Sequence, residues 1–125
     1  MSARAEEPAF DRIQLFVPEG DRRSKTTPVD LHDKWVIRML RVTGRLFGGA
    51  TSYGRGVGVW TGGRRFYWDR VTVVEIWADA NHPRHLARLK RLGREIHAMR
   101  RGLRQRAALC IINGEMKYFR GGSRS

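Results

Sequence analysis

Residues 70–101, RVTVVEIWADANHPRHLARLKRLGREIHAMRR, change their hydrophobic period halfway along and so indicate the fold. The first part, 70–78, is rich in β-branched and aromatic residues, which is typical of a β-strand. The second part repeats apolar residues at helical spacing from Asn81, the expected N-cap, to about Arg101, with Gly102 near the helix end. A strand followed directly by an amphipathic helix predicts a sheet covered by helices.

An earlier strand and helix precede this unit. Residues 12–17 alternate in polarity, which indicates a strand that ends at Pro18. A helix is expected over 28–47, because Thr27 is a suitable N-cap and Gly48 a suitable stop. Its apolar stripe comprises Leu31, Trp35, Met39, Val42 and Leu46.

The segment before the quoted strand is expected to form a β-hairpin with it. Residues 51–60 contain β-branched and aromatic side chains, although three glycines weaken this arm. Residues 61–65 carry two glycines and two arginines and predict a flexible, basic tip.

The last part of the chain predicts another strand and a turn. Residues 107–112 are a short apolar strand, and Asn113-Gly114 is the dipeptide preferred in type I′ turns, so 115–119 is expected to fold back. The order strand, helix, hairpin, helix, strand is the βαββαβ pattern of ferredoxin-like α+β sandwiches, an antiparallel sheet with two helices on one face. The alternative is an α+β fold in which the Asn113-Gly114 hairpin is an extra sheet edge.

Length and composition favour one domain. The chain has 125 residues, of which 41% are hydrophobic and 30% charged. We expect a single domain at 10–120 with disordered tails at 1–9 and 121–125. No membrane span or signal peptide is evident, and the one cysteine, Cys110, excludes an internal disulfide framework, so the expected location is the cytoplasm.

Positive charge is concentrated in the second helix. The chain has 25 Lys and Arg against 12 Asp and Glu, a net charge of +13, and residues 81–106 hold nine basic residues and one acid. Like charges on one helix face repel each other, so an anionic partner would relieve the repulsion. The alternative is a solvated face that reflects an arginine-rich composition.

These charges favour a small nucleic-acid-binding module with weak sequence specificity, whose partner is DNA or RNA and which needs no cofactor. Phosphates would contact the outer face of the second helix, and the hairpin tip would add cations and an aromatic ring. The predicted nucleic-acid-binding residues are Arg84, Arg88, Lys90, Arg91, Arg94, Arg101, Arg64, Arg65 and Tyr67.

Two other functions stay open. An interaction protein would use the open sheet face, with Phe16, Trp77 and Tyr53, to pair with an identical subunit or a larger acidic protein. An enzyme or small-ligand binder would use a pocket between the sheet and the helices near Glu75, the one acid in a strongly apolar strand. Glu75 must pair if it faces the helices, and it marks the open face as polar if it faces outward.

The sequence predicts no catalytic or metal constellation. Asp79, His82 and His85 have three-residue spacing, but they fall at a helix start, where added cations are disfavoured. Cys110 is in an apolar strand and is expected to be an inert core thiol.

Four parts of the chain carry a family resemblance: Phe47-Gly48-Gly49-Ala50-Thr51, Gly58-Val59-Trp60, Val73 to Ile76, and Gln105 with the apolar strand after it. They resemble a group of small uncharacterised bacterial proteins that share an F-G-G-x-T turn, a G-x-W hairpin arm and a late Gln before the final strand. The resemblance covers roughly residues 12–119 and implies a ferredoxin-like fold without an activity. The chain departs from that group in its arginine-rich second helix and hairpin tip.

Overall fold

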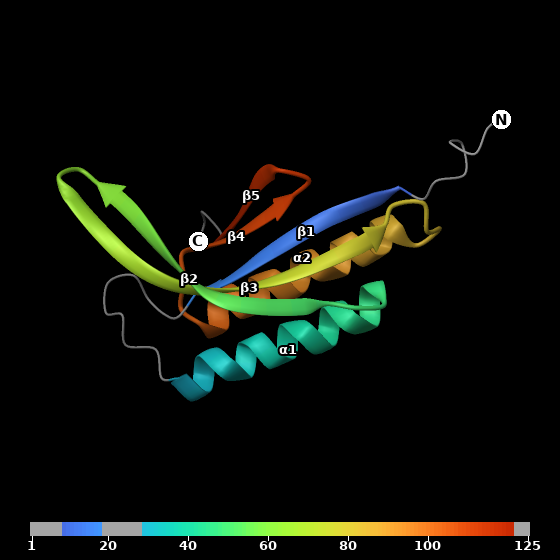
Figure 1. Cartoon of the computed structure of the whole chain (residues 1–125), viewed down its shortest axis with the longest axis horizontal. Coiled ribbons are helices and arrows are strands. Elements are labelled where there is room, and N and C mark those ends of the chain that lie inside the picture. The colour runs from blue at the N-terminus through green and yellow to red at the C-terminus, as the bar shows by residue number, and fades with distance from the viewer. Residues whose placement is uncertain (1–8, 19–28, 122–125) are drawn as a thin grey trace.

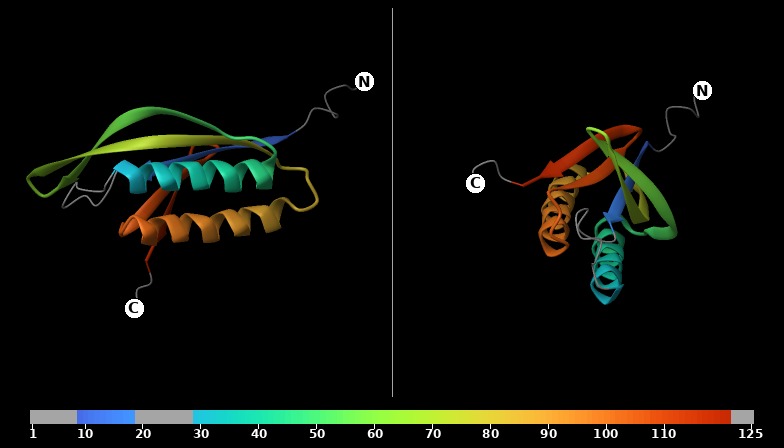
Figure 2. Two further views of the ribbon diagram at one scale, coloured as in Figure 1. Left: turned by 90° about the horizontal axis from the view of Figure 1, so that it is seen from below. Right: turned by 90° about the vertical axis from the view of Figure 1, so that its left-hand side faces the viewer.

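The computed structural model describes residues 9–18 and 29–121, which form a five-stranded antiparallel sheet with both helices on one face (Figures 1 and 2). The elements are β1 (Phe10–Pro18), α1 (Val29–Phe47), β2 (Thr51–Gly62), β3 (Arg65–Asp79), α2 (His85–Gly102), β4 (Ala107–Ile112) and β5 (Glu115–Arg120). The strand order is β2-β3-β1-β4-β5. The predicted ferredoxin-like α+β fold is therefore confirmed, with β5 as an additional edge strand.

Alternation along the central strand β1 separates the two faces of the sheet. Ile13, Leu15 and Val17 are fully buried against the helices. Gln14 lies opposite Glu75 in the register between β1 and β3, and both project to the other face. Each strand therefore contributes one row of side chains to the core and one row to the face that the helices leave open.

The core lies between the sheet and the two helices, and burial of its apolar surface is the main force that holds the layers together. Met39 of α1 and Leu92, Ile96 and Met99 of α2 are almost completely buried there. Trp35 packs so closely on the end of α2 that a Cβ atom added to Gly102 would lie 2.2 Å from the ring atom Cζ2. The two helices therefore contact each other as well as the sheet.

The end of α1 follows the sequence prediction. Gly48 has a φ of 90°, and its N–H donates to the carbonyl of Gly44 at 2.9 Å, which ends the helix. The expected N-cap Thr27 lies outside the described residues, as do positions 1–8 and 122–125 of the predicted tails.

The predicted start of α2 is wrong. The helix begins at His85, and Asn81 does not cap it. The carboxylate of Asp79 accepts a hydrogen bond from the Asn81 N–H at 2.9 Å, and the His82 ring accepts one from the Arg84 N–H at 3.0 Å. These local bonds hold the segment in turns and delay the helix. Leu86, in the first turn of the helix, is 74% exposed.

The two hairpins have the expected positions. Asn113 and Gly114 have φ angles of 51° and 85°, the positive pair that a type I′ turn requires. The β2–β3 hairpin is longer than predicted and extends beyond the rest of the sheet (Figure 1), with an irregularity between Tyr53 and Arg55. Neither α1 nor α2 is apolar enough over its length to cross a bilayer, and the described residues contain no other helix that is.

Candidate functional site

The face of the sheet opposite the helices gathers polar and aromatic side chains from three strands. The register places Arg12 opposite Trp77 and Gln14 opposite Glu75. Thr51 of β2 lies opposite Glu75 on its other side, with Tyr53 two residues further along. We call Arg12, Gln14, Tyr53, Glu75 and Trp77 the open-face cluster.

A carboxylate and an aromatic ring hold one cation in this cluster. The Arg12 Nε pairs with the Glu75 carboxylate, and the Arg12 guanidinium carbon lies 5.5 Å from the centroid of the Trp77 ring. The ion pair raises the pKa of Arg12, chiefly through its hydrogen bond to Glu75. The Glu75 side chain is only 16% exposed, whereas Trp77 is 57% exposed. The face therefore offers a recessed anion beside an accessible indole.

Neutral hydrogen-bonding groups extend the cluster toward β2. The Gln14 Nε2 donates to the Tyr53 hydroxyl at 3.4 Å, and Tyr53 is 42% exposed. The phenol, the carboxylate and the amide thus come from the neighbouring strands β2, β3 and β1, respectively. The exposed rings of Tyr53 and Trp77 provide two surfaces on which a planar group can stack.

Glu75 corrects one expectation and confirms another. The prediction of a pocket between the sheet and the helices near Glu75 is wrong, because the Glu75 side chain projects away from the helices. Its outward position marks the open face as polar, as predicted for a Glu75 side chain that faces outward. Of the predicted interaction residues, Trp77 and Tyr53 are exposed on this face and Phe16 is half-buried.

The basic residues of α2 occupy a different part of the molecule. Arg84, Lys90, Arg91, Arg94 and Arg101 are exposed, and Arg88 is half-buried. Arg64 is exposed at the turn between β2 and β3, while the side chains of Arg65 and Tyr67 lie outside what the structure describes. Their role in phosphate binding stays a prediction.

An acid whose pairing sequence reasoning overlooked compensates part of the basic face. Glu95 of α2 is buried, and its carboxylate accepts hydrogen bonds from the Arg91 Nε at 3.2 Å and the Arg38 Nη2 of α1 at 3.3 Å. Arg38 also lies over the Trp35 ring, with 5.4 Å between the guanidinium carbon and the ring centroid. The face is therefore partly neutralised within the fold. The i,i+4 spacing of Arg91 and Glu95 was the available signal.

A second polar cluster joins the start of α2 to the ends of β1 and β4. The Asp11 carboxylate lies 2.7 Å from the His85 Nε2 and accepts a hydrogen bond from the Asn113 amide at 2.9 Å. These bonds, first that of Asn113 and then that of His85, lower the pKa of Asp11. Because the carboxylate accepts, His85 carries its proton on Nε2, which leaves its buried Nδ1 without a partner in the described part of the chain. Only the fold brings these residues together.

The other cysteine, histidine and acidic residues considered as site candidates contribute to the fold. Burial raises the pKa of the Cys110 thiol to about 12, as expected for an inert core thiol. His32 is buried and lies 3.3 Å from the Thr72 hydroxyl. Asp79, His82 and His85 do not form a metal-binding group, and the structure shows none elsewhere in 9–18 and 29–121.

Comparisons with known proteins identify structural relatives. No protein-family model matches the chain, and no curated protein matches it in sequence. Among solved structures, a phage SAM lyase in complex with S-methyl-5′-thioadenosine is similar over 92% of both chains, with 14% identity and a TM-score of 0.62. A phage SAM lyase in the apo state is similar over 89% of both chains, with 15% identity and a TM-score of 0.59. At this identity the likeness shows a shared fold.

The prediction of a DNA- or RNA-binding module is contradicted. The solved structures that share the fold along most of the chain are lyases, and one of them holds a small nucleoside. The pairing of Arg91 with the buried Glu95 also removes part of the unmatched charge on which that prediction depended. Net charge is an argument about solubility and association and does not define the activity of a fold.

Proposed function

We propose that the protein is an enzyme that binds a small sulfonium nucleoside, of the type of S-adenosylmethionine, on the open face of its sheet. The observation that carries this proposal is the cation held between Glu75 and Trp77. A carboxylate beside an aromatic face is the combination that proteins use to recognise onium cations, because the ring quadrupole and the negative charge both attract them. A sulfonium centre is such a cation.

In the structure Arg12 occupies the position that the ligand's cation would take. Its side chain is 46% exposed, and solvent screens an ion pair of this kind, so a ligand displaces it at small cost. Once displaced, the guanidinium is free to pair with the carboxylate of an amino-acid moiety. Arg12 and Glu75 together therefore suit a ligand that carries both a cation and a carboxylate.

The other members of the cluster suit a nucleoside. Stacking of a base on an aromatic ring contributes about 1–3 kcal/mol, and the exposed rings of Trp77 and Tyr53 offer such surfaces. The Gln14 amide and the Tyr53 hydroxyl supply hydrogen bonds to a polar edge. The solved phage SAM lyases with the same fold support the proposal, since one of them binds a thioether nucleoside.

Binding to the wild-type protein tests the proposal. Isothermal titration calorimetry with S-adenosylmethionine is expected to show binding at least tenfold tighter than with S-adenosylhomocysteine, its neutral thioether analogue, because only the sulfonium is attracted by Glu75. In a lyase step the carboxylate of the ligand's own amino-acid moiety attacks the carbon bonded to sulfur, so a C–O bond forms as the C–S bond breaks and its electron pair stays on sulfur. Chromatography should then detect S-methyl-5′-thioadenosine and an amino lactone in equal amounts. Equal affinity for the two ligands would contradict the proposed recognition of the cation.

A second candidate function is self-association through the same face. Five large apolar residues are exposed on its outward rows, and patches of this kind often bind other proteins. They are Phe10, Tyr53, Trp77, Met116 and Tyr118. Sedimentation equilibrium separates the candidates: a protein whose main role is self-association forms a stable oligomer without ligand, and Trp77→Ser dissociates it.

A further inference from the structure

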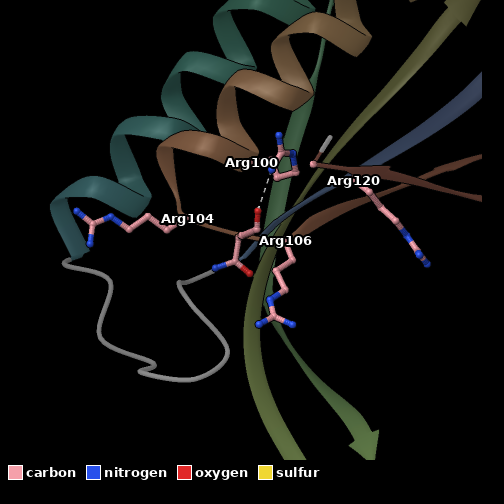
Figure 3. A pocket seen from close by; sticks show the side chains of 6 residues that line it. Arg100, Arg104, Arg106 and Arg120 are labelled. Carbon is pink, nitrogen blue, oxygen red and sulfur yellow. Dashed lines mark hydrogen bonds between the residues drawn. The ribbon is translucent and has the colours of Figure 1, made fainter. Parts of the chain in front are cut away.

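An arginine-lined hollow lies at the end of α2, away from the open-face cluster (Figure 3). It has a volume of about 410 Å³ and is open to solvent. Residues of α2, of the segment before β4 and of the end of β5 form it, and the N–H of Gly121 donates to the Arg106 carbonyl at 3.2 Å to hold two of these segments together. The lining residues are Arg100, Arg104, Gln105, Arg106, Arg120 and Gly121.

No acid in the described part of the chain balances the charges of this hollow. Arg100 donates to the carbonyl of Gln105 at 3.2 Å and to the His97 ring at 3.3 Å, and Arg120 lies over the Tyr118 ring. None of the four lining arginines has an acidic partner among the residues that the structure describes. Figure 3 shows the guanidinium groups of Arg104, Arg106 and Arg120 pointing apart, so these side chains must turn toward the hollow to bind one anion together.

Arg104 occupies a backbone position that favours glycine. The Gln105 N–H donates to the Arg100 carbonyl and the Arg104 N–H to the Arg101 carbonyl, which is a Schellman motif. In this motif the residue after the C-cap is left-handed and is usually glycine, yet Arg104 adopts a φ of 57°. Glycine would therefore adopt this backbone conformation with less strain, and the arginine side chain found here adds a cation to the rim.

The lining also restricts the ligand. It contains four guanidinium groups, one amide and one glycine, and no aliphatic or aromatic side chain that would receive a base or an acyl chain. Guanidinium groups bind phosphate oxygens in pairs and stay charged at all physiological pH values. We propose that this hollow binds a short phosphate chain, such as pyrophosphate or tripolyphosphate, as a site separate from the open-face cluster.

Titration calorimetry with pyrophosphate and tripolyphosphate tests the site on the wild-type protein and two variants. Arg106→Gln should weaken binding roughly tenfold or more, because a charge-assisted hydrogen bond is lost. Arg104→Gly should also weaken binding, yet raise Tm by roughly 4 °C, because glycine relieves the left-handed backbone. The opposite changes in affinity and Tm distinguish a ligand-binding residue from a structural one.

The matched control is Arg84→Gln, which removes one exposed arginine at the other end of α2 and should change the affinity less than twofold. Equal losses in Arg84→Gln and Arg106→Gln would show diffuse attraction and overturn the proposal, as would absence of binding to the wild type at low salt. A parallel titration with a nucleoside triphosphate shows whether the phosphate chain is bound as part of a nucleotide. Affinity much higher than for tripolyphosphate would overturn the proposal that only the phosphates are recognised.

Discussion

The two faces of the sheet are made by the same strands but have different roles. On the helix side, Leu15 and Ile76 are fully or almost fully buried, and their exchange for other apolar residues of equal volume would preserve the core. On the open side, Arg12, Glu75 and Trp77 form an ion pair and a cation–π contact that folding does not require. The comparison teaches that the residues that stabilise the fold and those of the proposed ligand site are separated by the two-residue period of the strands.

The largest loss of stability is expected from the helix side. Leu15→Ala removes a fully buried side chain and leaves a cavity, so the free energy of unfolding should fall by about 2–5 kcal/mol. Its neighbour Gln14 projects to the open face, and Gln14→Ala should change this free energy by less than about 1 kcal/mol. Urea denaturation measures both, and similar losses in the two variants would contradict the division between the faces.

A smaller loss is expected where the two helices meet. Gly102→Ala places a Cβ atom 2.2 Å from the Trp35 ring, so the ring or the helix end must move, at a cost of about 1–3 kcal/mol. Gly44 in α1 has nothing within 4 Å of the corresponding position, so Gly44→Ala should stabilise the protein by up to about 1 kcal/mol. Thermal unfolding checks both signs. A Gly102→Ala variant as stable as the wild type would disprove the close packing.

The cluster of Asp11, His85 and Asn113 at the start of α2 should make the free energy of unfolding depend on pH. The folded pKa of Asp11 lies below its usual value of 3.8, so the ionised carboxylate stabilises the fold above that pH, and this contribution is lost as the pH falls through the folded pKa. Asp11→Asn should cost about 1 kcal/mol at pH 7. The stabilities of the variant and the wild type, measured by denaturation from pH 7 to 2, should converge in acid. A constant difference would contradict the assignment.

The smallest effect on stability is expected from the open face. Arg12→Gln breaks an exposed ion pair and a cation–π contact that solvent screens, so the free energy of unfolding should change less than in Asp11→Asn. The same urea titrations measure this change. A loss as large as that of Leu15→Ala would mean that the open-face cluster is part of the folding core.

Periodicity was sufficient to predict most of the fold. The alternation at 12–17 and the helical spacing after residue 85 reflect burial on one side, which each segment encodes locally. The start of α2 was mispredicted because the Asp79 and His82 side chains bond to nearby backbone and hold turns where Asn81 resembles a cap. Competition of this kind depends on geometry that a residue pattern does not contain.

The candidate site was predicted only in part. Glu75 was recognised as unusual in an apolar strand, but its partner Arg12 is 63 positions away, and only the register of β1 on β3 brings them together. Likewise, charge counting identified the basic face of α2 and its one acid, Glu95, but did not reveal that Glu95 pairs with Arg38 of α1. Long-range pairing therefore decides which charges are free, and composition alone does not reveal it.

The central claim is that Glu75 recognises a sulfonium cation on the open face. The most direct test is the affinity of Glu75→Gln for S-adenosylmethionine, with Glu115→Gln as a matched control, because Glu115 is an exposed strand acid paired only with Lys117 among the described residues. We predict at least a tenfold loss of affinity for Glu75→Gln and none for Glu115→Gln, with both variants folded. Affinity of Glu75→Gln equal to that of the wild type would contradict the claim.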